Sequence, residues 1–398
     1  MRISTHNSYG SALDSLIERQ ARLAGTQEQM TTGKRVNRAS DDPAAAARAE
    51  RALASERRSV ADQRAIDASN NAMTLTETAL ADAGGLLQQA REALVAAGNA
   101  TYSDTERAGV ADQLTQLREQ LFAVANRSDG AGTYLFAGQG TTQPPFADVP
   151  GGVQFQGVAG QAQAASSEPL PLTMDGASTW MQARSGNGVF ETRVVASTGS
   201  AWIDTGRVRD PAAVTGATYR VQFGVSGGVT TYSVLKNGVA TAQTNVPYAS
   251  GQSITVDGLS ATVTGAPANG DAFDLAPASP SLSVFGALDQ AIADLKTPGR
   301  NGTQIAQSNV FNLNHLDAVM VQVSAGRSRI GATMNRIDAA SERTSALKLA
   351  SQTERSNAED LDMTQAISEF SNQQTGYDAA LKAYSMVQRL SLFNYLNN

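Results

Sequence analysis

The chain has 398 residues and a net charge of −6, and it contains no cysteine and only two histidines, His6 and His315. These counts exclude disulfides, thiolate nucleophiles and cysteine-based zinc sites, and they leave few side chains for metal or acid–base chemistry. Neither nucleic acid nor an anionic membrane is an expected partner of an acidic chain. The sequence contains no run of about 20 apolar residues, which is the length needed to span a bilayer. We therefore expect no cofactor and no metal.

The distribution of proline divides the chain into helical and non-helical parts. Ten of the twelve prolines and both tryptophans lie between residues 141 and 280. Because proline breaks helices, the predicted fold class is mainly α with a β-rich insert, in which the N- and C-terminal segments form a long antiparallel helical bundle or coiled coil. The predicted domains are a terminal helical pair (1–42 and 350–398), a helical bundle (43–140 and 281–349) and a β-rich outer domain (141–280).

Both ends of the chain carry the heptad pattern of a coiled-coil seam, with steps of four and three residues. The seam residues at the first end are Tyr9, Leu13, Leu16, Gln20, Leu23, Gln27 and Met30. Those at the second end are Met363, Ile367, Phe370, Gln374, Tyr377, Leu381 and Tyr384, and Val387, Leu390 and Phe393 extend the apolar surface further. Since an apolar stripe must be buried, the two ends are expected to pack on each other and then on further partners.

A helix start follows the first seam. Asp42 precedes Pro43, and Asp at the N-cap with Pro at the first helical position is a favourable combination. We therefore interpret Asp41, Asp42 and Pro43 as a turn and helix cap. The alternative, a pair of catalytic carboxylates, has no candidate base or metal ligand to support it.

A long helix is predicted from Pro43 to about Ala97. Its large apolar residues are spaced by seven, at Ile66, Met73, Leu80, Leu87 and Leu94. Gly84-Gly85 lies in the middle of this helix and predicts a kink or weak point. Ser103 and Glu106 have the spacing of a capping box, and they predict a third helix from there to about Val124.

The insert is predicted to contain strands. Residues 218–226 and 229–235 flank Gly227-Gly228, which is a hairpin signal. Residues 189–195, 253–256, 261–264 and 272–275 are further candidate strands. No phosphate-binding glycine pattern occurs in the chain.

Helical patterning resumes at Ser281, and Pro298-Gly299 ends a first short helix. A heptad pattern then runs from Leu313 to Ile337, with Arg327 at one of its core positions. No proline separates this pattern from the last helix, predicted from Asp360 to about Tyr395. We therefore expect the two to form one rod on the order of 100 Å long.

Several segments resemble the flagellin superfamily, and most closely the FlgL family of hook–filament junction proteins. They are the initial Met-Arg-Ile-Ser-Thr, Gly33–Pro43, Gly132-Thr-Tyr-Leu-Phe-Ala-Gly138, Gly265–Phe273 and Arg389-Leu-Ser-Leu-Phe-Asn-Tyr-Leu396. The Asp-Asp-Pro break is shared across the superfamily. The Tyr-Leu-Phe-Ala-Gly and Ser-Leu-Phe-Asn-Tyr-Leu runs are the specific part.

The resemblance implies a structural axial protein of the bacterial flagellum, with no enzymatic activity. Such a subunit forms a junction layer between the hook-associated region and the filament. The implied partners are other copies in a ring or helical layer, a preceding FlgK-like hook-associated protein, flagellin and a flagellar export chaperone. The implied location is extracellular, at the hook–filament junction, after type III export without a cleaved signal peptide. The termini of such subunits are often disordered until assembly.

Two other functions remain open from the residues alone. The first is flagellin itself, a filament-forming subunit. The second is an enzyme carried on a coiled-coil stalk, whose site would lie in the insert. The carboxylates available there are Asp204, Asp210, Asp257, Asp271 and Asp274. They form no known catalytic pattern, and turn or strand-end positions explain them.

Overall fold

The computed structural model describes residues 5–99, 101–140 and 143–396, without the side chains of 5–9 and 387–396. The chain forms two compact units: one contains the residues up to 64 and from 341 onward, and the other contains 65–340. The division falls inside two long helices, α2 (Pro43–Ala97) and α5 (Gly302–Glu359). The domain borders predicted at 42/43 and 349/350 do not coincide with this division. The first is the start of α2, and the second lies within α5.

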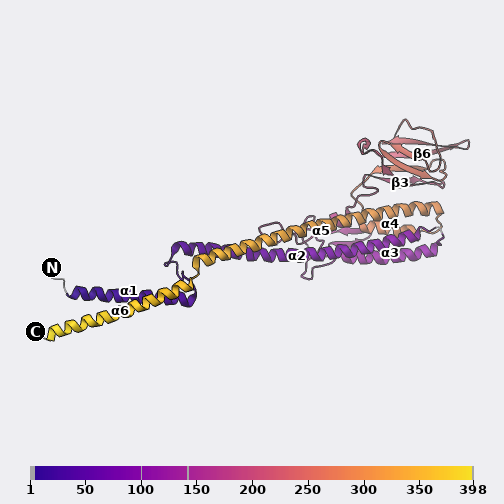
Figure 1. Ribbon diagram of the computed structural model, residues 1–398. Coiled ribbons are helices and arrows are strands. Elements are labelled where there is room, and N and C mark those ends of the chain that lie inside the picture. Colours follow the sequence, from indigo (N-terminus) through magenta and orange to yellow (C-terminus); the bar gives the residue numbers. More distant parts are fainter. Residues whose placement is uncertain (1–4, 100, 141–142, 397–398) are drawn as a thin grey trace. The chain divides into compact units, whose positions relative to one another are not determined.

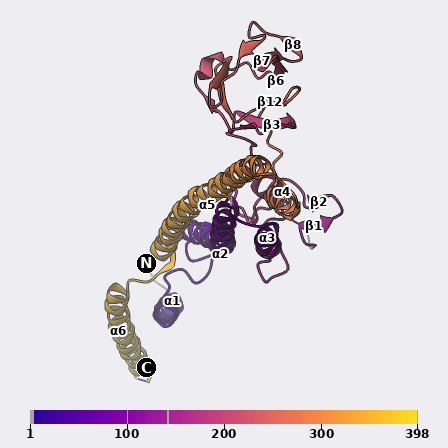
Figure 2. The same cartoon turned by 90° about the vertical axis from the view of Figure 1, so that its right-hand side faces the viewer.

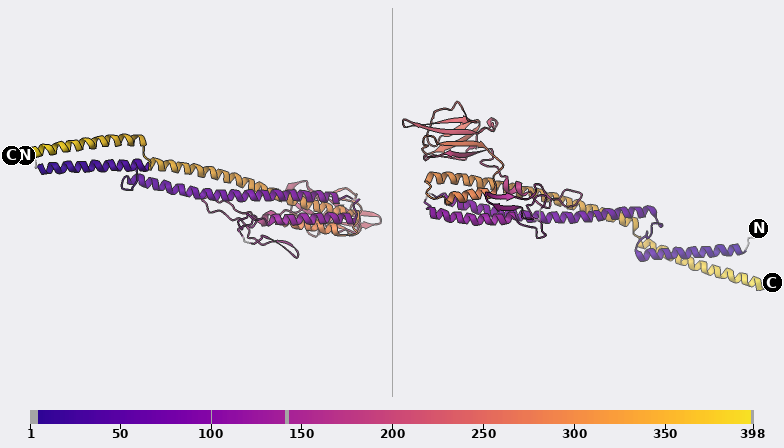
Figure 3. Two further views of the ribbon diagram at one scale, coloured as in Figure 1. Left: turned by 90° about the horizontal axis from the view of Figure 1, so that it is seen from below. Right: turned by 180° about the vertical axis from the view of Figure 1, so that it is seen from behind.

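The unit that holds both termini contains two antiparallel helix pairs (Figures 1 and 3). One pair is α1 (Thr5–Thr32) with α6 (Met363–Leu396), and the other is the start of α2 with the end of α5. The second pair has a thin core of buried alanines such as Ala49 and Ala52. Polar contacts accompany it: the Gln352 amide donates to Glu56 Oε1 at 2.8 Å.

The predicted single rod is wrong, because the chain breaks between α5 and α6. Asp362 Oδ1 accepts hydrogen bonds from the Thr364 and Gln365 backbone N–H groups at 3.0 and 3.1 Å, which starts a new helix. The backbone before it bonds to the α1–α2 connection, with Leu361 N donating to Gly33 O at 3.0 Å. The heptad pattern does not report this break, because a distant segment of the chain stabilises it.

The second unit is a helical bundle that carries the insert. Seen from the direction of Figure 2, α2, α3 (Asp104–Ala125), α4 (Val284–Lys296) and α5 lie together. The predicted heptad residues of α2 are confirmed as core: Ile66, Met73, Leu80, Leu87 and Leu94 are all at most 3% exposed. Residues of α5 in the same core are Leu316, Val323, Ile330 and Ile337. The α2 helix continues through Gly84-Gly85 without a break.

Arg327 lies outside this core although it occupies a heptad position. Its guanidinium forms an ion pair with Glu77 at 2.6 Å across the exposed side of α2 and α5. The capping box at the start of α3 is confirmed: Glu106 N donates to Ser103 Oγ, and Ser103 N donates to Glu106 Oε2.

The first part of the predicted insert belongs to the bundle core. Residues 146–181 form the hairpin of β1 (Phe146–Val149) and β2 (Gly152–Phe155) and the short helix η1 (Ala177–Met181). Trp180 of η1 stacks on Phe285 of α4, with ring centroids 5.9 Å apart and an interplanar angle of 12°. The domain border predicted at residue 141 therefore differs from the packing, which places this segment against the helices.

The remainder of the insert is a two-sheet β structure. One sheet has the order β3 (Phe190–Ala196), β12 (Ala272–Pro277), β6 (Tyr219–Ser226), β7 (Val229–Lys236) and β8 (Val239–Ala240), with β9 (Val246–Pro247) also on β7. The other contains β10 (Ser253–Val256), β11 (Leu259–Thr264) and β4 (Trp202–Ile203), with β5 (Arg207–Val208) also on β11. The short helix η2 (Pro211–Ala213) follows β5. The core includes Phe190, Tyr219, Phe223, Ile203 and Val263.

The hairpin predicted at Gly227-Gly228 is confirmed, since Ser226 pairs with Val229 across it. Both glycines have positive φ, 58° and 80°, which a two-residue turn of this kind requires and which side chains disfavour.

The carboxylates of the insert accept hydrogen bonds or form ion pairs that stabilise the fold. Asp204 and Asp210 accept from backbone N–H groups of nearby turns. Asp257 and Asp274 form ion pairs with Lys236 and Arg220. This arrangement supports the turn and strand-end interpretation over a catalytic one.

Asp271 is completely buried, and it accepts hydrogen bonds from the backbone N–H groups of Thr198 (2.7 Å), Gly199 (3.1 Å) and Ala268 (2.8 Å). Burial alone would raise the pKa of Asp271, but these hydrogen bonds outweigh burial and lower it. A carboxyl whose folded-state pKa is depressed stabilises the fold above its unfolded pKa of about 3.9 and loses that contribution as pH falls through the folded pKa.

We therefore expect the free energy of unfolding of the insert to fall as pH drops below about 4, partly through Asp271. Asp271→Asn should cost roughly 1–3 kcal/mol at pH 7, because it leaves buried donors without a carboxylate, and it should flatten the acid dependence. Urea unfolding followed by Trp202 fluorescence in a Trp180→Phe background measures this. The exposed Glu119→Gln is the control, and an unchanged pH slope in Asp271→Asn contradicts the assignment.

The aromatic stack provides a second test. Trp180→Ala should lower the free energy of unfolding by about 3–5 kcal/mol, because it removes a fully buried aromatic side chain. Val321→Ala, at a side chain that is 70% exposed on α5, should change it by less than about 0.5 kcal/mol. Urea unfolding followed by far-UV circular dichroism compares the two. Equal effects would show that residues 146–181 do not belong to the helical core.

Candidate assembly surface of the terminal helices

The α1–α6 pair is held by a narrow line of contacts. Leu16 and Thr26 of α1 and Ala366 of α6 are at most 8% exposed. Across the pair, the Thr26 hydroxyl donates to Gln373 Oε1 at 3.0 Å. Gly376 allows Arg19 close to the α6 backbone, since a Cβ built there would lie 3.2 Å from Arg19 Nη1.

The predicted seam residues divide between this line and the exposed surface. Leu16 is buried, and partly buried residues are Leu23, Met30, Phe370, Tyr377 and Tyr384. Leu13, Ile367 and Leu381 are 48%, 52% and 41% exposed. The side chains of Tyr9, Leu390 and Phe393 lie outside the described residues.

The residues of the contact line follow a heptad pattern that differs from the predicted one at every second position. At those positions the contact residue lies one place earlier in the sequence. On α6 the less exposed residues are Ala366, Phe370, Gln373, Tyr377, Ala380 and Tyr384, again at steps of four and three. Sequence reasoning missed Ala366, Thr26, Gln373 and Gly376 because it ranked heptad positions by apolar size. Small and polar residues at heptad spacing were the signal that could have found them.

The shift leaves apolar side chains without a partner in the pair. Besides Leu13, Ile367 and Leu381, the residues Ile17 (56% exposed), Met363 (43%) and Met386 (59%) reach solvent. Ile367 and Leu381 are two heptads apart, so they recur on the same side of α6. We call the set Leu13, Ile17, Met363, Ile367, Leu381 and Met386 the exposed apolar set.

The two chain breaks are joined to each other beside this pair. Lys34 and Asp360 form an antiparallel β-bridge, and Arg35 N donates to Glu359 O at 2.7 Å. Lys34 Nζ also lies 3.2 Å from Glu359 Oε1. Backbone hydrogen bonds and a side-chain ion pair therefore both hold the α1–α2 and α5–α6 connections together.

Asp41, Asp42 and Pro43 shape the start of α2. Asp42 Oδ1 accepts from Ala45 N at 3.0 Å, and Asp41 Oδ2 accepts from the N–H groups of Asn37 and Arg38 at 3.1 and 2.8 Å. Two hydrogen bonds lower the pKa of Asp42. The one from Ala45 N has the larger effect, and the one from the Arg35 side chain has the next largest. Both carboxylates are therefore engaged with backbone donors.

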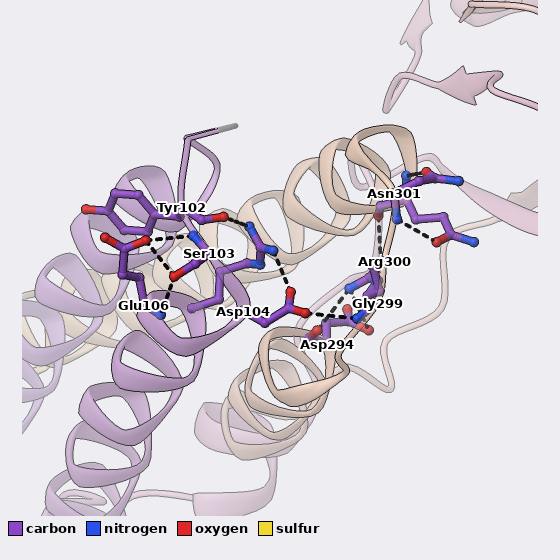
Figure 4. Close-up of polar contacts among 10 residues, drawn as sticks. Tyr102, Ser103, Asp104, Glu106, Asp294, Gly299, Arg300 and Asn301 are labelled. Atoms are coloured by element: carbon purple, nitrogen blue, oxygen red, sulfur yellow. Dashed lines mark hydrogen bonds and ion pairs between the residues drawn. The ribbon is translucent and has the colours of Figure 1, made fainter.

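Within the unit of residues 65–340, a polar cluster lies where α3 begins and α4 gives way to α5 (Figure 4). Gly299 N donates to Asp104 Oδ2 at 3.0 Å, and Arg107 Nη2 donates to Asp104 Oδ1 at 2.6 Å. These two contacts lower the pKa of Asp104, the backbone hydrogen bond having the larger effect. Arg300 donates to Asp294 O at 3.0 Å. The cluster joins the connections between helices.

Within the described residues, no group of three or more histidine, aspartate or glutamate side chains could hold a metal ion. Among the helices in the described ranges, none is long and apolar enough to cross a membrane. Burial lowers the pKa of His315, which lies on α5.

Comparison with known proteins matches both ends of the chain to flagellin families. The bacterial flagellin N-terminal helical region matches residues 3–141, and the bacterial flagellin C-terminal helical region matches residues 313–396, which together exceed half of the chain. Flagellar hook-associated protein 3 of Escherichia coli is 25% identical over 99% of this chain and 99% of its own length. Its namesake in Salmonella typhimurium is 39% identical over 38% of this chain and 48% of its own length.

A solved structure extends the likeness to the fold. The crystal structure of the flagellar junction protein FlgL from Legionella pneumophila superimposes with a TM-score of 0.65 at 26% identity, over 70% of this chain and 95% of that one. The chain belongs to the flagellin superfamily, in its FlgL group. The mainly helical fold with a β-rich insert that the sequence predicts is therefore the FlgL-type fold.

The matched segments of this FlgL-group chain contain α1, α6, both chain breaks and the joint between them. Residues 142–312, which include the whole β structure, lie outside both family matches. The candidate assembly surface is therefore in the part of the chain that the superfamily shares.

The contact line can be tested on α1. Leu16→Ala should weaken the α1–α6 pair by about 2 kcal/mol or more, because Leu16 is packed, and amide exchange in α1 should become at least tenfold faster. Leu13→Ala is the matched control, because its side chain is 48% exposed. Hydrogen exchange of residues 10–32 in the full chain gives the readout. Equal acceleration in both variants would contradict the shifted line.

Proposed function

We propose that the protein is a structural junction subunit of the bacterial flagellum, forming a layer between the hook-associated region and the flagellin filament. The observation that carries the proposal is the exposed apolar set on α1 and α6. Six large apolar side chains at 41–59% exposure, all on one helix pair, indicate a surface that is covered in an assembly.

The energetics of the terminal pair agree with assembly-coupled order. Two helices of about 30 residues with a narrow contact line have few buried apolar residues to stabilise them. Neighbouring subunits would cover the exposed apolar set and add the missing burial, at roughly 25 cal/mol per Å² of apolar surface. Order at the termini would then be strongest within the layer.

The proposed partners are other copies of the chain, a preceding FlgK-like hook-associated protein, and flagellin. We place the protein outside the cell at the hook–filament junction. Delivery would follow the flagellum's type III export pathway without a cleaved signal peptide, with an export chaperone for the unfolded chain. A chain without cysteine suits this route, because no disulfide has to form after export.

The FlgL assignment fits better than flagellin, since the FlgL crystal structure superimposes on this chain with a TM-score of 0.65 at 26% identity, over 95% of its own length. Localisation separates the two functions. We expect antibody against the insert to label only the hook tip of flagella, and label along the whole filament would identify a filament subunit instead.

The exposed apolar set provides the mutational test. Ile367→Asp combined with Leu381→Asp should abolish incorporation into flagella and motility, because the charges would lie in the subunit interfaces. The same variant should leave the free subunit nearly as stable as before, within about 1 kcal/mol, since both side chains are exposed.

Motility assays, immunoblots of sheared flagella and urea unfolding together measure these outcomes. Val321→Asp, at an exposed apolar residue of the bundle, is the control. Immunoblots of the culture supernatant establish that the variant is exported. Normal filaments on cells that carry the double variant would refute the proposed role of this surface.

A further inference from the structure

Strand β3 of the insert has an open edge. In the order of its sheet, β3 is terminal and pairs only with β12 within the described residues. Ala278 N donates to Val189 O at 2.9 Å. Because alternate residues of an antiparallel strand bond to the same neighbour, Glu191 and Arg193 direct their backbone groups to β12. Thr192 and Val194 therefore direct their N–H and C=O groups to the open edge.

A groove of about 690 Å³ runs along this edge. Residues 191–197 of the insert line one side, and side chains of α4 and α5, including Asp294, Gln304, Phe311 and His315, line the other. The stretch from Glu191 to Val195 spans roughly 13 Å at about 3.3 Å per residue. The groove is therefore long enough for an extended segment of about five residues.

The edge of the neighbouring sheet is closed, in contrast to β3. The side-chain amide of Gln307 on α5 accepts from Ile203 N at 2.7 Å and donates to Ile203 O at 3.0 Å. The amide thus takes the place of a partner strand on β4, and both contacts are buried. Closing an edge in this way prevents strand addition, and no such contact covers Thr192 or Val194 among the described residues.

The side chains along the open edge define what would fit. Glu191 is 6% exposed, and its Oε1 accepts no hydrogen bond of normal geometry, although it forms an ion pair with Arg193. The Arg193 side chain is 63% exposed, and Val195 is 46% exposed. Since directly opposed residues of antiparallel strands interact, a complementary strand carries a basic residue opposite Glu191, an acidic one opposite Arg193 and an apolar one opposite Val195.

We propose that the open edge of β3 is a docking site for an extended segment of a partner protein, which adds an antiparallel strand of the pattern apolar-x-acidic-x-basic. The occupant is a peptide segment because the free groups are backbone donors and acceptors, and because the groove has the length of a short strand. The site is separate from the terminal helices and does not depend on the proposed junction function.

The test uses the full chain and the labelled peptide acetyl-Ser-Val-Thr-Glu-Thr-Lys-Ser-amide. Its control has the same composition with the charges exchanged, acetyl-Ser-Val-Thr-Lys-Thr-Glu-Ser-amide. Fluorescence anisotropy should show at least tenfold tighter binding of the first peptide. Glu191→Gln should remove most of this preference, whereas Glu119→Gln on α3 should keep it. Circular dichroism establishes that both variants are folded.

Backbone methylation tests strand addition without changing the protein. N-methyl groups on the two threonines, which lie opposite Thr192 and Val194, should abolish binding, because they remove the paired N–H groups. An N-methyl group on the central glutamate should be tolerated, because that N–H points away from β3. Hydrogen exchange at Thr192 and Val194 should slow when the first peptide binds.

Three results would overturn the proposal. They are equal binding of the two charge patterns or no binding at about 1 mM, tolerance of the methylated threonines, and light scattering that shows a dimer whose formation protects Thr192 and Val194. The last result would identify a second copy of this chain, rather than a partner's segment, as the occupant of the edge.

Discussion

The antiparallel packing of α2 against α5 is the interaction on which the rest of the structure depends. In each of the two units, this packing places residues from the first quarter of the sequence against residues from the last quarter. In the unit of residues 65–340, the packing uses large apolar side chains such as Leu80 and Val323. In the other unit it uses alanines and polar contacts such as Gln352 with Glu56. The same helices therefore pass from a thick core to a thin one.

The terminal pair continues this trend toward less burial. Leu16 and Ala366 are its most buried apolar residues within the described side chains, while Ile17 and Ile367 remain exposed. Stability is then lowest where the proposed assembly contacts are, since local stability follows the number of buried apolar contacts. The backbone joint at Lys34 and Asp360 holds the end of α1 and the start of α6 together before any partner arrives.

The insert follows different physical rules from the helices. Its two sheets have their own core, and its acidic residues stabilise turns and strands. The edges of its two sheets differ, because the Gln307 side chain closes the edge of β4 whereas the edge of β3 borders a groove. The insert also lies outside the matched flagellin regions. The surface of the insert can therefore have binding properties that differ from those of the helical part, which the superfamily shares.

Local patterns in the sequence determined much of this protein. The heptad of Ile66 to Leu94 marks a helix core, Ser103 and Glu106 cap α3, and Gly227-Gly228 permits a tight hairpin. Each depends on residues within one or two turns of each other, so periodicity and turn chemistry are sufficient to predict them. The flagellin-like motifs at both ends were visible for the same reason.

Contacts between distant segments decided the remainder. Trp180 lies in a proline- and glycine-rich stretch, yet it belongs to the helical core because Phe285 stacks on it. The α5–α6 break has Asp362 as its local signal, but Gly33 and Arg35, more than 300 residues earlier, hold the backbone there. Which heptad residues face inward between α1 and α6 also required the structure. A repeat of 3.5 residues identifies a stripe, and only the partner helix selects which edge of that stripe is buried.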